Sequence, residues 1–78
     1  KDMERWLGSV DLALTLEPWN IALTGERGML RYRLGDTSGA LADLERYVEA
    51  TGRPRVSAGA LRLLDELRAH HEGKEESR

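Results

Sequence analysis

Four apolar segments, with residues that interrupt helices between them, constrain this chain of 78 residues more than any other feature of its sequence. In each segment apolar residues recur every three or four positions, which is the spacing of one face of an α-helix. The strongest stripe consists of Ala40, Leu41, Leu44, Tyr47 and Val48. No stretch of four or more residues alternates cleanly as a strand would, and β-branched residues are few. The pattern therefore predicts an all-α fold.

Residues that break or cap helices place the ends of the four predicted helices. Proline and glycine interrupt helical hydrogen bonding or allow a left-handed final residue, whereas asparagine, aspartate and threonine cap the first turn. The predicted helices cover about residues 2–16, 20–34, 37–51 and 55–71, within a single domain over residues 1–73 and before a disordered polar tail over residues 74–78. The residues used to set these bounds are Pro18, Asn20, Gly35, Asp36 or Thr37, Thr51, Gly52, Pro54 and Gly73.

Short connections limit how these helices are arranged. Loops of about two to five residues leave each helix beside the one before it, so the sequence predicts successive antiparallel hairpins. With 40% hydrophobic residues, the chain has enough apolar content for one domain and one core. A chain this short buries only about 60% of the surface that its unfolded form exposes, so its stability is expected to be marginal unless something else covers its apolar faces.

The spacing of small residues in the second and third segments is distinctive. Gly28 is followed seven residues later by Gly35, twelve later by Ala40 and sixteen later by Leu44. This spacing resembles the tetratricopeptide repeat, in which small residues let two helices cross closely and a glycine makes the turn between them. The resemblance implies about one and a half repeats, with a half repeat first and a C-terminal capping helix last. It also implies a non-catalytic protein-interaction or scaffold module.

A narrower resemblance concerns residues 27–30, 34–36 and 42–48, which look like the repeat tail of bacterial transglutaminase-like proteins. It implies an alternative function, that of a regulatory tail in a larger transglutaminase-like or peptidase-like protein. Three residues depart from the general repeat. Arg27 and Arg31 stand where it prefers a leucine and an aromatic residue, and Tyr47 stands where it prefers a small one.

In tetratricopeptide arrays the first helix of each repeat lines the concave face. In this sequence the resemblance assigns that face to Ala22, Glu26, Met29, Tyr32 and Arg33. An aromatic ring, a flexible thioether and a guanidinium suit a bound protein or peptide. The alternative is that the same residues pack against a helix or domain outside this chain.

Two arginines in the second segment lie one helical turn apart. Arg27 and Arg31 have the spacing to hold a phosphate or a carboxylate together. The alternative is that both guanidinium groups pair with acids of the third helix such as Asp43.

The first segment has apolar residues outside its main stripe. Leu12 and Leu16 lie away from the face that holds Met3 and Val10, and Trp19 follows the end of the helix. Together with Trp6 they form the predicted oligomer face, through which a second copy would make a homodimer. The alternative is that neighbouring helices of the same chain cover this segment.

Other classes of site find little support. The absence of cysteine excludes thiolate zinc sites. His70 and His71 are adjacent, so a helix points them about 100° apart and they are expected to bind no metal. No cofactor motif or catalytic constellation is present, so the chain is expected not to be an enzyme. The net charge of -2 argues against nucleic acid, and the lack of a leader or membrane span predicts a cytoplasmic protein without membrane contact.

Overall fold

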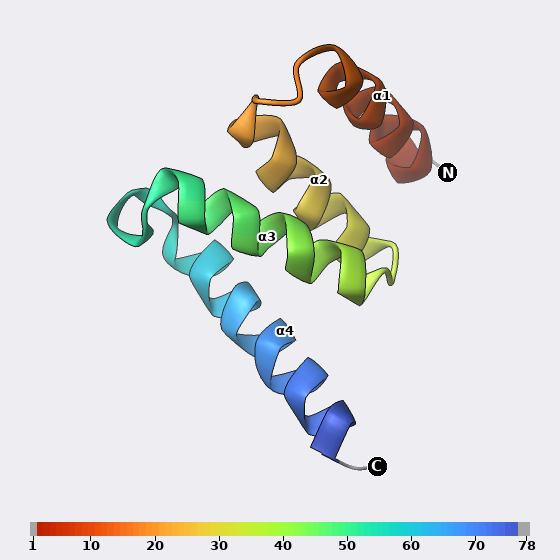
Figure 1. Cartoon of the computed structure of the whole chain (residues 1–78). Coiled ribbons are helices and arrows are strands. Elements are labelled where there is room, and N and C mark those ends of the chain that lie inside the picture. Colours follow the sequence, from red (N-terminus) through yellow and green to blue (C-terminus); the bar gives the residue numbers. More distant parts are fainter. Residues whose placement is uncertain (1, 77–78) are drawn as a thin grey trace.

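The fold consists of four helices joined by short turns. The computed structural model describes the backbone of residues 2–76 and the side chains of residues 2–71. The helices are α1 (Asp2–Leu16), α2 (Ile21–Arg33), α3 (Thr37–Thr51) and α4 (Ala58–Glu76), with the short 3-10 helix η1 (Arg53–Arg55) before α4 (Figure 1). The described residues contain no strand, which confirms the all-α prediction.

Successive helices pack against each other as antiparallel hairpins. The contact between α2 and α3 is the most extensive, α1 packs on α2, and α4 packs on α3 (Figure 1). This arrangement confirms the predicted class of helical hairpin repeat. The molecule is correspondingly flat, with extents of 38 × 31 × 18 Å along its principal axes.

The turns around α2 follow directly from local residue chemistry. The Asn20 side chain accepts a hydrogen bond from the amide of Leu23 and so caps the first turn of α2. At the other end Gly35 adopts a positive φ of 91°. The Gly35 amide donates to the carbonyl of Tyr32, and the Asp36 amide donates to that of Arg31. These two bonds make a Schellman motif, which ends α2 and reverses the chain into α3.

The start and end of α4 differ from the sequence prediction. The helix begins at Ala58 rather than at about residue 55, because residues 53–55 form η1 and Val56 is extended. Val56 is buried although it precedes the helix. Its apolar side chain continues the stripe of α4, which is why the predicted helix began too early. The backbone also continues through Gly73 to Glu76, which contradicts a helix end at Gly73. Of the predicted tail over residues 74–78, residues 77 and 78 lie outside the described residues.

Helices α2 and α3 approach each other most closely around Gly28. A Cβ atom built on Gly28 would lie 3.0 Å from Cγ of Leu44 and 3.1 Å from Cβ of Asp43. Ala40, one turn before Leu44, is completely buried. The absence of a side chain at residue 28 therefore lets α3 lie against the backbone of α2.

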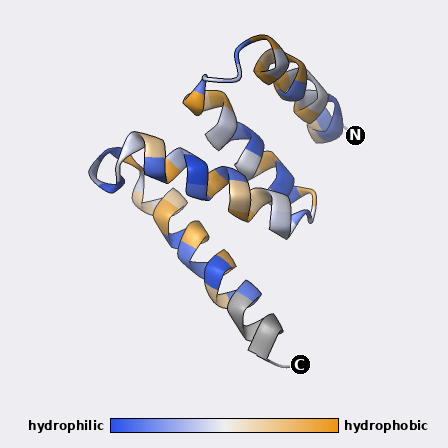
Figure 2. Ribbon diagram, viewed as in Figure 1, coloured by the Kyte–Doolittle hydropathy of each residue, from blue (hydrophilic) through white to orange (hydrophobic). Residues whose placement is uncertain are grey.

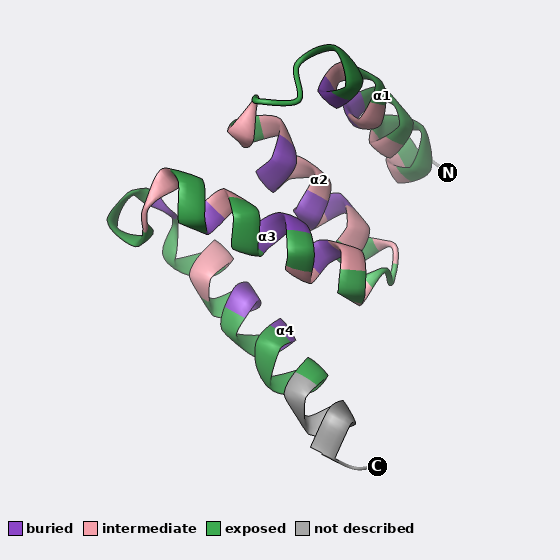
Figure 3. Cartoon of the chain, in the orientation of Figure 1, coloured by how far each residue is buried: buried purple, intermediate pink, exposed green. Residues whose placement is uncertain are grey.

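The apolar core is divided into two clusters, whereas the sequence analysis expected one. The α3–α4 cluster consists of seven buried residues, and the α1–α2 cluster of three (Figure 3). Their members are Ala40, Leu44, Val48, Val56, Leu63, Leu64 and Leu67 in the first, and Val10, Leu14 and Leu30 in the second. Between them, the buried residues Thr24, Gly25 and Gly28 of α2 bring almost no apolar side chain. Hydrophobic and hydrophilic segments alternate along the described helices (Figure 2), as expected of helices with one apolar face.

Replacing Gly28 by valine tests the close approach of α2 and α3. The added side chain overlaps Leu44 and Asp43, so we expect the free energy of unfolding to fall by about 1–3 kcal/mol, measured by urea denaturation. Gly8→Val is the matched control, because Gly8 is an exposed helical glycine with no other atom within 4 Å of its Cβ position. The control should change stability by less than about 0.5 kcal/mol. Equal effects of the two substitutions would contradict the close packing.

Candidate functional site

An open groove of about 550 Å³ runs along one face of α2. Its floor is formed by Ala22, Glu26, Met29 and Arg33, which recur at helical spacing and therefore share one side of the helix. Gly25 and Leu30 complete the contribution of α2. From Ala22 to Arg33 the floor is about 16 Å long.

One wall of the groove comes from α1 through Trp6. Its indole Nε1 donates a hydrogen bond to Oε2 of Glu26 across 3.0 Å. The ring is still 49% exposed, so part of its apolar surface faces the groove and the solvent. The hydrogen bond fixes one end of the indole while the ring remains available for contact.

The opposite wall comes from α3 and from the start of α4. Leu44 and Tyr47 line it on α3, and Ser57, Gly59 and Ala60 line it farther along the chain. The Ser57 hydroxyl accepts a hydrogen bond from the amide of Ala60 and so caps α4.

Tyr47 fits beside α2 because residue 25 is a glycine. A Cβ atom on Gly25 would lie 2.8 Å from Cδ1 of the Tyr47 ring. The large Tyr47 side chain on α3 is thus accommodated because the facing residue on α2, Gly25, has no side chain. The sequence analysis identified Tyr47 as a departure from the general repeat but missed its partner, for which a second glycine one turn before Gly28 was the available signal.

The structure brings four of the five predicted concave-face residues together. Ala22, Glu26, Met29 and Arg33 line the groove, whereas Tyr32 is 43% exposed and does not line it. Trp6, which the sequence analysis assigned to an oligomer face, lines the groove instead.

The floor of the groove has two charged side chains, of which one accepts a hydrogen bond from a described residue and the other makes no such contact. Glu26 is engaged by Trp6, whereas the Arg33 guanidinium makes no hydrogen bond or ion pair within the described part of the chain. Arg33 is also exposed. It is therefore the charged group in the groove that is available to a ligand.

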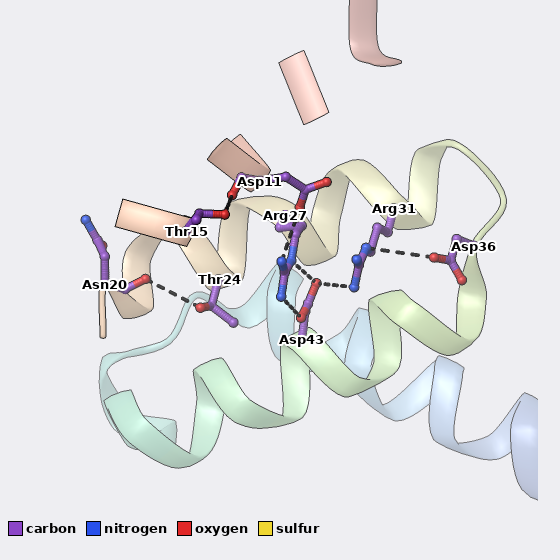
Figure 4. A network of polar contacts seen from close by, with 8 residues as sticks. All are labelled: Asp11, Thr15, Asn20, Thr24, Arg27, Arg31, Asp36 and Asp43. Atoms are coloured by element: carbon purple, nitrogen blue, oxygen red, sulfur yellow. Dashed lines mark hydrogen bonds and ion pairs between the residues drawn. The ribbon is translucent and has the colours of Figure 1, made fainter. Parts of the chain in front are cut away.

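A network of charged side chains occupies another side of α2 (Figure 4). Arg27 contacts Asp43 through two bonds, from Nε to Oδ2 at 2.9 Å and from the terminal nitrogen Nη2 to Oδ1 at 3.0 Å. Its other terminal nitrogen donates to Oδ1 of Asp11 on α1 at 3.1 Å. Arg31 donates to the same Asp43 carboxylate at 3.1 Å, and its Nε lies 3.8 Å from Oδ2 of Asp36.

This network confirms the alternative in which Arg27 and Arg31 pair with Asp43. The Asp43 side chain is only 7% exposed, so its charge would be costly without partners. The hydrogen bonding of Arg27 to the Asp43 carboxylate is the largest influence on Arg27, and it raises the pKa of Arg27 above the ordinary value despite partial burial. Both guanidinium groups therefore link helices rather than present a ligand site.

The outer surface of α1 carries exposed apolar side chains. Leu12 is 64% exposed, Leu16 is 71% exposed and Trp19 in the following turn is 74% exposed. Leu12 and Leu16 are four residues apart and share one face of α1. The structure does not group Trp6 with them, because Trp6 lies in the groove wall.

The described residues provide neither a metal site nor a membrane-spanning helix. His70 and His71 are exposed on α4, and the side chains described contain no group of three or more His, Cys, Asp or Glu residues that could hold a metal ion. Among residues 2–76, no helix combines the length and apolar character needed to cross a membrane.

Antiparallel hairpins that pack mainly on their neighbours along the chain, with a groove along one helix, define a helical-repeat protein. A family model described as tetratricopeptide repeat matches residues 1–66, and the chain belongs to that family. Membership indicates a protein-interaction or scaffold module. No curated protein and no solved structure matches the chain. The resemblance to the tail of transglutaminase-like proteins, the bacterial origin and the cytoplasmic location remain predictions.

Removal of the Asp43 carboxylate tests the charged network. Asp43→Ala leaves Arg27 and Arg31 beside each other without their shared partner, so we expect the free energy of unfolding to fall by about 2–4 kcal/mol. The loss is below that of a fully buried pair, because the two arginine side chains remain 25% and 27% exposed. Asp65→Ala is the matched control.

The control removes a carboxylate that is 61% exposed and lies 4.0 Å from Arg53. It should change the free energy of unfolding by less than about 0.5 kcal/mol in the same denaturant titration. If the two alanine variants were equally stable, the network would have no structural role.

Proposed function

We propose that the chain binds a segment of another protein along the α2 groove. The observation that supports this most directly is the grouping of Ala22, Glu26, Met29 and Arg33 on the floor of one open groove. The walls add aromatic surface from Trp6 and Tyr47, which gives large contact area at low conformational cost. Met29 adds a flexible apolar side chain that adapts to different ligands.

The same groove favours binding over catalysis. Its ionisable carboxylate, Glu26, is engaged by the Trp6 indole. The Ser57 hydroxyl caps α4, and no histidine is among the groove-lining residues to act as a base for Ser57 or Tyr47. We therefore assign the groove a non-catalytic, protein-binding role.

Selection of random peptides against the folded chain tests the proposal. Ala22 is exposed on the groove floor, so Ala22→Arg fills the groove without disturbing the core. We expect selected peptides to bind Ala22→Arg at least about tenfold more weakly than the original chain in a fluorescence-anisotropy titration. Ala69→Arg is the matched control, because Ala69 is an exposed helical alanine that does not line the groove.

Peptides should bind the Ala69→Arg variant and the original chain equally well. A selection that yields no peptide sensitive to Ala22→Arg would exclude the groove as a binding site.

Self-association through α1 is a second candidate, favoured by the exposure of Leu12 and Leu16. Two leucines one turn apart at 64% and 71% exposure form an apolar strip that a second copy would cover. In a symmetric dimer the same strip would be used on both copies.

Light scattering coupled to size exclusion measures the molar mass of the chain in solution and so tests self-association. If α1 mediates a dimer, Leu12→Glu and Leu16→Glu should each convert it to a monomer, because each places a charge inside the apolar contact. Thr15→Glu, at an exposed residue of the same helix outside the strip, should leave the dimer intact. A mass that stays monomeric at every concentration of the original chain contradicts self-association.

A further inference from the structure

The α2 groove combines apolar surface with one charged group that has no partner among the described residues. Trp6, Met29 and Tyr47 supply the apolar surface, and Arg33 supplies a guanidinium at the C-terminal end of the floor. Glu26 keeps its negative charge, but one of its oxygens accepts from Trp6, whereas Arg33 has no carboxylate partner among the described residues. The C-terminal end of the groove floor therefore offers a ligand an unpaired positive charge.

The walls of the groove restrict the backbone conformation of a ligand. Along α1, α2 and α3 the backbone amides and carbonyls are hydrogen-bonded within the helices themselves. An extended ligand would find no strand edge on these helices with which to pair its backbone groups, so those groups would gain no hydrogen bonds from the walls. A helical ligand satisfies its backbone groups internally and presents only side chains.

The floor also matches the side-chain spacing of a helix. Ala22, Glu26, Met29 and Arg33 are separated by four, three and four residues, so they form a stripe along one face of α2. The small Ala22 and the engaged Glu26 leave space beside Met29, into which side chains of a second helix pack as ridges into grooves. A floor of about 16 Å corresponds to roughly three helical turns of such a partner.

From these observations, and resting on the proposed protein-binding function, we propose that the groove recognises an amphipathic helix of a partner protein that carries an acidic residue facing Arg33. Apolar side chains of this helix pack between Trp6 and Tyr47 over Met29. The carboxylate pairs with the Arg33 guanidinium and sets the direction in which the helix lies.

A library of random peptides of about 14 residues, long enough to span the groove as a helix, tests the inference. We expect the peptides that are sensitive to Ala22→Arg to share apolar residues at helical spacing and an aspartate or glutamate beside them. Their affinity should fall about tenfold for Arg33→Glu, where like charges face each other. Arg62→Glu is the matched control, because Arg62 is exposed on α4 outside the groove and should leave affinity unchanged.

Two changes in the peptide complete the design. Replacing its acidic residue by lysine should restore binding to Arg33→Glu, and a proline in the middle of the peptide should abolish binding to the original chain. Peptides that need Ala22 but lack the acid, tolerate Arg33→Glu or accept the proline would overturn the inference and leave the proposed function standing.

The remaining outcomes concern the occupant itself. If no selected peptide is sensitive to Ala22→Arg, both the inference and the proposed function fail. If instead the chain associates with itself, and Ala22→Arg alone abolishes that association in light scattering, the groove holds a second copy of the chain and the acidic partner helix is excluded.

Discussion

The close approach of α2 and α3 at Gly28 is the constraint on which the other features depend. Because residue 28 has no side chain, Leu44 and Asp43 lie directly against α2. Although adjacent in sequence, the two side chains belong to different parts of the structure. Leu44 closes the α3–α4 cluster and lines the groove, whereas Asp43 joins Arg27 and Arg31. One glycine thus sets the distance at which both the apolar wall and the charged network form.

The division of the core explains why polar contacts matter in so small a chain. Only Val10, Leu14 and Leu30 are buried between α1 and α2, so little apolar area holds α1 in place. The bond from Arg27 to Asp11 and the bond from Trp6 to Glu26 add two directional contacts between the same helices. Because Trp6 forms a wall of the groove, the shape of the groove depends on how α1 is held.

Sequence reasoning succeeded where the structure depends on local chemistry. Asn20 and Gly35 determine the ends of α2 through their own backbone and side-chain preferences. It failed where position depends on a distant neighbour. The helical spacing of Trp6 gives its angle on α1 but does not say that Glu26 lies opposite. For Tyr47 the available signal was the glycine at residue 25, three residues before Gly28, but the spacing alone does not pair the two residues. Val56 has the spacing of a helical core residue, yet it is an extended residue between η1 and α4 and is buried in that conformation.

Both core clusters reach the groove, where Leu30 of one and Leu44 of the other are lining residues. The α1–α2 cluster has three buried residues, whereas the α3–α4 cluster has seven, so α1 is expected to open by local fluctuations separate from those of α3. A ligand that touches both leucines links these fluctuations, since α1 cannot detach without losing part of the bound surface. Occupancy would then slow amide hydrogen exchange in α1 and α3 together, so the chain would gain cooperativity from its partner rather than from its own core.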